Sequence, residues 1–252
     1  MERNLKHRLL GNIPIPLKDI CFIHSLTIKE ILFDIDKYEL MLSNLIIEIK
    51  DIVPDAKDTE NIHTFDILIY NILQDKKGDY CKYILDAIKT FIKEDVSFVF
   101  TPSEDLDNIP NSAYFSIGNQ EKPEECRFLG KKDYDEFKYI LKKSNNINDK
   151  EVEEEYKPLN SRAQEILDKI NKGKAKIAKR KGELHLTDIV SSIVAKNSLN
   201  LIDVMEYNIY QVYDILSRIQ MIEEFETSIN SLLAGCDPDK IDVKHYLRPR
   251  DR

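Results

Sequence analysis

The sequence predicts a mainly α-helical protein, a helical bundle with a small antiparallel β meander inserted near residues 96–130. Three observations support this fold class. Over long stretches, apolar residues recur every three or four positions, which is the spacing of an amphipathic helix. Polar capping residues precede several of these stretches. Short β-rich runs separated by turn residues gather in one region, around residues 96–130.

Composition narrows the class of protein further. The chain has 252 residues, of which 42% are hydrophobic and 33% charged, as in a globular protein with one large domain or two small ones. Its net charge of −8 disfavours binding to DNA through the whole surface, because such binding normally needs a basic surplus. The four cysteines are scattered without a CxxC motif, which indicates reduced thiols: Cys21, Cys81, Cys126 and Cys236.

We expect residues 1–95 to form an N-terminal helical subdomain. Its first segment, Met1 to Pro16, is predicted to be irregular, since each proline disfavours a helical residue before it. Leu17 to Phe22 is predicted to be a short strand or a docked arm. Thr27 and Glu30 then form a capping box that predicts the start of a helix.

Three more helices are expected in this subdomain. Asp36 is the predicted cap of the next helix, which carries apolar residues such as Leu40 and Leu45 on one face. Another helix is predicted to start at Thr64, and a fourth follows Asp79 after a break at Gly78.

Residues 96–145 are predicted to hold the meander and one helix. Val96–Phe100 is a β-rich run interpreted as an alternating strand, Ala113 to Ile117 is a second candidate strand, and Cys126 to Leu129 is a third. A sheet this small needs a helix to pack on. The sequence supplies one that starts at Asp133 and turns Phe137 and its apolar neighbours toward the core.

The rest of the chain is predicted to be an acidic linker, 146–160, followed by a C-terminal helical region, 161–252. Ser161 to Lys181 predicts a basic helix, and Thr187 is the predicted cap of the next one. The basic part, residues 169–181, suggests either a patch that contacts phosphates or a solvated helix face. We favour the solvated face, because the helix lacks aromatic residues that could stack on bases.

A long helix is the main element of this region. Asn208 and Gln211 form a capping box at its start, and Gly235 followed by Pro238 ends it. Its apolar residues are expected to form one stripe that must be buried against the chain or a partner: Ile209, Val212, Tyr213, Leu216, Ile219, Ile222, Phe225, Ile229, Leu232 and Leu233.

The sequence predicts no enzyme. It contains no GxSxG, GxxxxGK[ST], GxGxxG or HExxH motif, so we nominate no catalytic residue, no cofactor and no metal site. The acidic run from Glu151 to Glu155 is predicted to be a solvated linker, since adjacent glutamates lack the fixed geometry that magnesium or calcium requires. No stretch is apolar enough for a membrane helix, so we expect no membrane partner.

Tyr207, Tyr210 and Tyr213 lie at three-residue spacing at the head of the long helix. Core packing is the favoured interpretation of these tyrosines. The alternative is a protein-binding ridge, because tyrosine offers a large contact area with a polar tip.

Several segments resemble tail proteins of phages and prophages from low-GC Gram-positive hosts, many of which are described as tail assembly chaperones. The similar segments are Leu199–Asp214 with Arg218 after it, Leu233–Pro238, Lys244–Tyr246, Ile15–Leu17 and Leu26–Ile31. The resemblance implies non-enzymatic work in building a phage tail or baseplate.

Within that resemblance we expect a tail assembly chaperone-like factor that contacts a tape-measure or hub protein in the host cytoplasm. One alternative is a permanent subunit of the virion tail or baseplate; another is a nucleic-acid-associated regulator that uses residues 169–181. Nucleic acid is the less favoured partner, and a homo-oligomer is left open. The residues expected to bind the partner are Tyr207, Tyr210, Tyr213, Arg218 and Tyr246.

Overall fold

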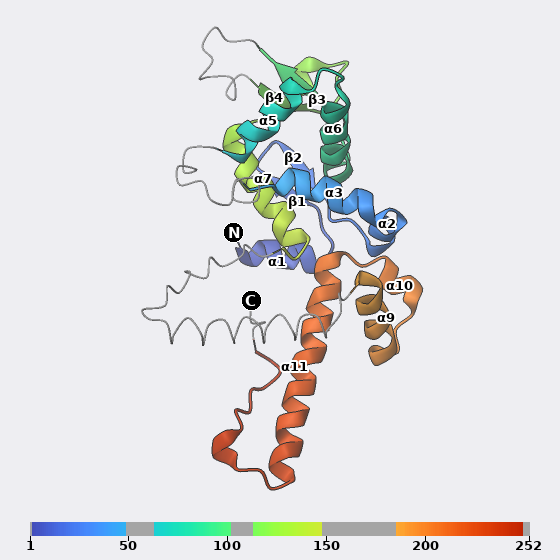
Figure 1. The fold of residues 1–252 in the computed structure, drawn as a ribbon, viewed down its shortest axis with the longest axis vertical. Helices are drawn as coiled ribbons and strands as arrows, with labels where there is room; N and C mark the ends of the chain where they lie inside the picture. Colours follow the sequence, from blue (N-terminus) through green and yellow to red (C-terminus); the bar gives the residue numbers. More distant parts are fainter. Residues whose placement is uncertain (1, 49–62, 102–112, 148–184, 249–252) are drawn as a thin grey trace, which may run out of the picture. The chain divides into compact units, whose positions relative to one another are not determined.

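A computed structural model describes residues 2–48, 63–101, 113–147 and 185–248. These residues are mainly helical with two small antiparallel sheets, which confirms the predicted fold class (Figure 1). By its contacts the chain divides into two compact units. Unit 1 contains Met1–Ile147 and Met205–Asp214, and unit 2 contains Asn148–Val204 and Ile215–Arg252. The predicted borders after residues 95, 145 and 160 stay predictions.

Unit 1 alternates helices with two small sheets. Its elements, in chain order, are α1 (Glu2–Leu10), β1 (Ile15–Leu17), β2 (Cys21–Ile23), α2 (Ile28–Phe33), α3 (Ile35–Ile46), α5 (Thr64–Gln74), α6 (Asp79–Ile92), β3 (Val96–Phe100), β4 (Ala113–Ile117), the 3-10 turn η2 (Pro123–Glu125), β5 (Arg127–Leu129) and α7 (Lys131–Ser144). Strands β1 and β2 form an antiparallel hairpin, and β3, β4 and β5 form the second sheet in that order.

The first segment of the chain differs from the prediction. Residues expected to be irregular form α1, and Leu5 and Leu9 on one face of this helix are 7% and 1% exposed. Two leucines four residues apart lie on the same side of a helix, so their burial stabilises an otherwise polar segment. The helix ends in a turn at Gly11 and Asn12, where Asn12 takes a positive φ of 50°, and the Ile13 N–H donates back to the Arg8 carbonyl at 2.8 Å. Ile15–Leu17 then forms the first strand of the hairpin.

Helix starts lie within two residues of the predicted positions, but several capping residues differ. The predicted cap of α6, Asp79, already lies in its first turn, and Gly78 is the N-cap. Thr27 and Glu30 make the predicted box, in which the Glu30 N–H donates to the Thr27 hydroxyl at 3.2 Å. The next helix is capped by Asp34 and not by Asp36, because the Asp34 carboxylate accepts the Lys37 N–H at 3.0 Å. Asp36 already lies in the first turn of α3.

The meander confirms the predicted strands. Val96 pairs with Ile117 and Phe115 with Leu129, both in antiparallel register. Helix α7 begins two residues before the predicted Asp133, after Gly130. Its residue Phe137 is fully buried, as expected.

An aromatic cluster joins the meander to the helices of unit 1. The ring of Phe65 lies 5.2 Å from that of Tyr134 and 6.1 Å from that of Phe115. Tyr134 also contacts Phe137, and its hydroxyl donates to the Leu45 carbonyl at 2.8 Å. These side chains place α3, α5, α7 and β4 around one core.

Unit 2 is built around the part of α11 that follows Asp214. The described elements are α9 (Leu186–Asn197), α10 (Leu201–Met205), α11 (Ile209–Leu233) and the 3-10 turn η3 (Pro238–Lys240); Met205 and the first turns of α11 belong to unit 1. His185, and not Thr187, is the N-cap of α9. Helix α9 lies beside α11, where Lys196 and Glu223 form an ion pair of 2.8 Å (Figure 1).

The apolar residues of α11 do not form the single stripe that was predicted. At about 100° per residue, the row of Val212, Leu216 and Ile219 lies roughly 160° away from the row of Phe225 and Leu232. The row therefore winds around the helix. Val212 is fully buried, whereas within Ile215–Leu233 Met221 is the one buried residue.

Candidate functional site

The segment Met205–Asp214, which we name the docking segment, packs in unit 1 although the residues on both sides of it belong to unit 2. Its backbone meets the start of α2, where the Ile28 N–H donates to the Tyr207 carbonyl at 2.8 Å. Thr27 and Asn208 form an isolated antiparallel bridge. Two of the segments that carry the phage resemblance, Leu26–Ile31 and Leu199–Asp214, therefore contact each other.

Asn208 is the centre of this contact. It is fully buried, and its side-chain carbonyl accepts the Gln211 N–H at 2.8 Å, which confirms the predicted cap. Its amide group donates to the Leu9 carbonyl at 2.9 Å and to Asn12 Oδ1 at 3.1 Å. Gln211 adds a bond from Nε2 to the Leu10 carbonyl at 2.7 Å. Polar bonds thus fix the head of α11 to the carboxyl end of α1.

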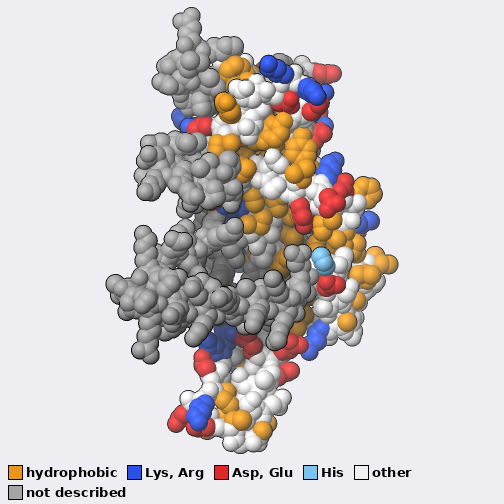
Figure 2. Space-filling view, viewed as in Figure 1, with side chains coloured by type: hydrophobic (Ala, Val, Ile, Leu, Met, Phe, Trp, Pro, Cys, Tyr) orange, Lys and Arg blue, Asp and Glu red, His pale blue; other side chains and the backbone are white. Residues whose placement is uncertain are grey.

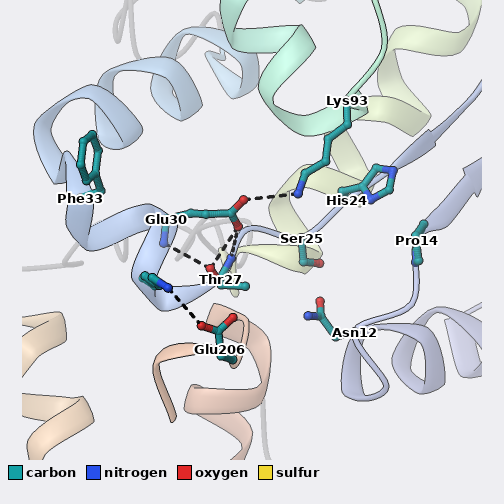
Figure 3. Close-up of a pocket in the computed structure, with 10 residues that line it drawn as sticks. Asn12, Pro14, His24, Ser25, Thr27, Glu30, Phe33, Lys93 and Glu206 are labelled. Atoms are coloured by element: carbon teal, nitrogen blue, oxygen red, sulfur yellow. Dashed lines mark hydrogen bonds and ion pairs between the residues drawn. The ribbon is translucent and has the colours of Figure 1, made fainter. Parts of the chain in front are cut away.

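A pocket of about 480 Å³ opens beside the docking segment (Figure 3). Asn12 and Pro14 line it from the segment between α1 and β1, and His24 and Ser25 from the end of β2. Figure 3 shows Thr27 at its centre. The pairing of the hairpin ends at Ile15 and Ile23, directly before Pro14 and His24 reach the pocket.

The pocket pairs each of its lysines with a glutamate. Lys93 Nζ lies 3.3 Å from Glu30 Oε1, and Lys29 Nζ lies 3.5 Å from Glu206 Oε1 (Figure 3). Burial opposes ionisation of Glu30, yet its bonds to Thr27 and the charge of Lys93 lower the pKa of this carboxyl. The pocket therefore offers hydrogen-bonding groups between ion-paired side chains. This arrangement suits a polar, uncharged part of a ligand or partner.

His24 is the titratable ring of the pocket. Burial, and next the charge of Lys93, lower the pKa of His24, so the ring is neutral at pH 7. Its backbone N–H donates to the Phe91 carbonyl at 2.7 Å, which ties this segment to the end of α6.

The five residues predicted to bind a partner are divided between the two units. Tyr207, Tyr210 and Tyr213 belong to the docking segment, with Tyr210 7% exposed and the other two half-buried. Burial raises the pKa of Tyr213. Arg218 and Tyr246 belong to unit 2. The structure thus brings the tyrosines together as packing residues of unit 1, and their role in partner binding stays a prediction.

Arg218 and Tyr246 hold the segment after η3 against α11. The Arg218 guanidinium donates to the Arg248 carbonyl at 2.9 Å. The ring of Tyr246 lies 5.5 Å from Phe225 and stacks on His245 at 4.5 Å. Farther along, hydrophobic side chains reach the surface near the carboxyl end of α11 (Figure 2), where Leu233 is 81% exposed.

Two predicted features lie outside the described residues: the basic helix 169–181 and the acidic linker 146–160 from residue 148 onward. Among the residues that are described, no group of three or more His, Cys, Asp or Glu side chains could hold a metal ion. In that same part of the chain, no helix is long and apolar enough to cross a membrane.

Comparison with known proteins gives one result, and it concerns the segment that contains α9, α10 and α11. Residues 177–249 match the family model of the YomV second domain. This is a phage-type family from the SPbeta region of Bacillus, and the match covers less than a third of the chain. No curated protein and no solved structure matches. The similarity to the YomV second domain agrees with a phage origin and assigns no role in a tail or baseplate.

Proposed function

We propose that this chain is a non-enzymatic phage protein that acts through protein–protein contacts in tail assembly, as a chaperone-like factor. The similarity of residues 177–249 to the YomV second domain supports the phage context. The resemblance of the docking segment and of Leu26–Ile31 to phage tail proteins supports a role in building the tail. These two segments contact each other in the structure, so this part of the resemblance falls on one connected region of unit 1.

The observation that carries the proposal is the surface of α11 beyond Asp214. A helix in a globular protein normally buries its apolar residues. Here Ile222 is 39% exposed and Leu233 81% exposed, whereas Val212 near the start of the same helix is fully buried. Apolar surface that remains exposed on unit 2 is suited to contact with another protein.

The pocket beside the docking segment fits the same proposal. Its lysines are paired with glutamates at 3.3 and 3.5 Å, and His24 is kept neutral. Such a surface suits contact with polar groups of a partner, so we assign it no reaction.

The partner is proposed to be a tape-measure or hub protein, met in the host cytoplasm. Co-expression of the full chain with each neighbouring tail protein, followed by affinity purification, tests this. We expect one stable complex, and failure of every tail protein to bind would refute the proposal.

Analysis of purified particles then separates two roles. A chaperone leaves before the particle is complete and is absent from it, whereas a structural subunit remains. Mass spectrometry that finds the chain in stoichiometric amount would favour the permanent subunit over the chaperone.

A further inference from the structure

We propose that α11 carries a helix-docking seam on unit 2, and that its occupant is a helix of another protein with a lysine or arginine opposite Glu226. This inference rests on the proposed function, since it names the surface through which a partner would bind. The seam is defined by its six residues, Ile215, Ile219, Ile222, Glu226, Ile229 and Leu233.

The spacing of the seam is that of a coiled coil. Its residues follow one another at intervals of four, three, four, three and four. This is a heptad repeat, in which Ile215, Ile222 and Ile229 occupy one core position and Ile219, Glu226 and Leu233 the other. A row with this mean spacing of about 3.5 residues stays on one side of two helices that wind around each other.

The seam is partly accessible within the described part of the chain. Ile222 and Leu233 are 39% and 81% exposed and Glu226 is exposed, whereas Ile215, Ile219 and Ile229 are half-buried. Phe225, which contacts Tyr246 of the segment after η3, lies three residues after Ile222 and four before Ile229, so this segment borders the seam. A partner helix would cover the exposed area of Ile222, Glu226 and Leu233.

Glu226 sets the chemistry of the partner. It is the single charged residue among five apolar ones, and a lone polar group in a coiled-coil core selects partner and register. The charge of Glu226 contributes to the raised pKa of Lys196 on α9. The main cause of that raised pKa is the hydrogen bond from Lys196 to Glu223. Within the described residues no hydrogen bond or ion pair of Glu226 occurs within 4 Å, so a cation brought by the partner could pair with its exposed carboxylate.

A second copy of this chain fits the seam poorly. In a parallel, in-register pair, Glu226 would face Glu226 of the other copy, and like charges in a core repel. In an antiparallel pair it would face an apolar residue and lose water without gaining a bond. A lysine or arginine at the matching position of a different helix removes both costs.

The test uses the full chain and two synthetic helical peptides. Both peptides carry three heptads with isoleucine and leucine in the core, and they differ only at the central position, which is lysine in one and glutamate in the other. Fluorescence anisotropy at physiological salt measures their affinities. We expect the lysine peptide to bind at least about tenfold more tightly, since it places an opposite charge where the other peptide places a like charge.

Charge reversal makes the test specific. The variant Glu226→Lys should reverse the preference for the two peptides. Glu39→Lys makes the same change of charge on an exposed residue of α3 in unit 1 and should leave the preference as it was. Ile222→Ser should weaken binding of both peptides, and circular dichroism verifies that each variant is folded.

Each outcome decides between named alternatives. The proposed seam would be refuted by equal affinities for the two peptides, by no binding of either peptide, or by an unchanged preference in Glu226→Lys. Dimers of the parent chain in sedimentation that are lost with Ile222→Ser would replace the partner helix by a second copy. If a tail protein binds the chain and Glu226→Lys has no effect on that complex, the proposed function is supported and the seam is refuted. If the lysine peptide binds and no tail protein does, the seam is supported and the function in tail assembly is refuted.

Discussion

Replacing Asn208 by alanine should loosen the head of α11 from unit 1. The substitution removes the cap of the helix, a loss typically of about 1 kcal/mol. It also removes the bond to the Leu9 carbonyl, which retains only a longer bond from the Asn12 N–H at 3.3 Å. Losing one buried hydrogen bond with a replacement at hand costs about 1 kcal/mol. We therefore expect the free energy of unfolding of unit 1 to fall by about 2 kcal/mol.

Hydrogen exchange measures this loss at the contact itself. The Gln211 N–H, which donates to Asn208 in the parent chain, should exchange about thirtyfold faster in Asn208→Ala, as 2 kcal/mol implies. Urea unfolding of the full chain gives the global value. Asn230→Ala, an exposed position farther along the same helix, is the control and should change stability by no more than about 0.5 kcal/mol. A change of that small size for Asn208→Ala would refute the role assigned to this side chain.

Three further predictions concern titratable groups. Burial raises the pKa of Tyr134, so stability is complete below about pH 10 and should fall as the pH rises above it; urea unfolding from pH 8 to 11 measures this, and an equal fall in Tyr134→Phe would contradict it. The lowered pKa of His24 means that stability should fall as the pH drops below about 6.5, and NMR titration should show this pKa rising in Lys93→Met; an unchanged value would exclude the lysine as a cause. Burial raises the pKa of Cys21 to about 12, so alkylation at pH 8 should modify the exposed Cys236 and reach Cys21 only on unfolding, a difference that mass spectrometry detects; equal rates would contradict the burial.

Elements with a local signature could be predicted from the sequence. The strands Val96–Phe100 and Ala113–Ile117 carry alternation and β-rich composition, and both occur as predicted. The box formed by Asn208 and Gln211 spans four residues and was likewise recognisable. In these cases neighbours in the chain decide the structure.

Features that depend on distant residues were missed. Helix α1 is polar apart from leucines such as Leu5 and Leu9, and it is stabilised by packing that its own sequence does not reveal. The capping box at Asn208 gave no sign that the same side chain would bind Leu9 and Asn12, almost two hundred positions earlier. The pocket arises from that contact, so it could not be predicted before the ends of the chain were placed together.

The apolar residues of α11 wind around the helix. The number of residues between two positions on it therefore decides the side of the helix on which each side chain lies. Deleting a single residue such as Ser217 would turn the residues beyond it by about 100° relative to Ile215. Composition and helicity would hardly alter, yet Glu226 would aim at a different side. The number of residues between Ile215 and Glu226 therefore matters to the exposed surface of α11 as much as the identity of its side chains.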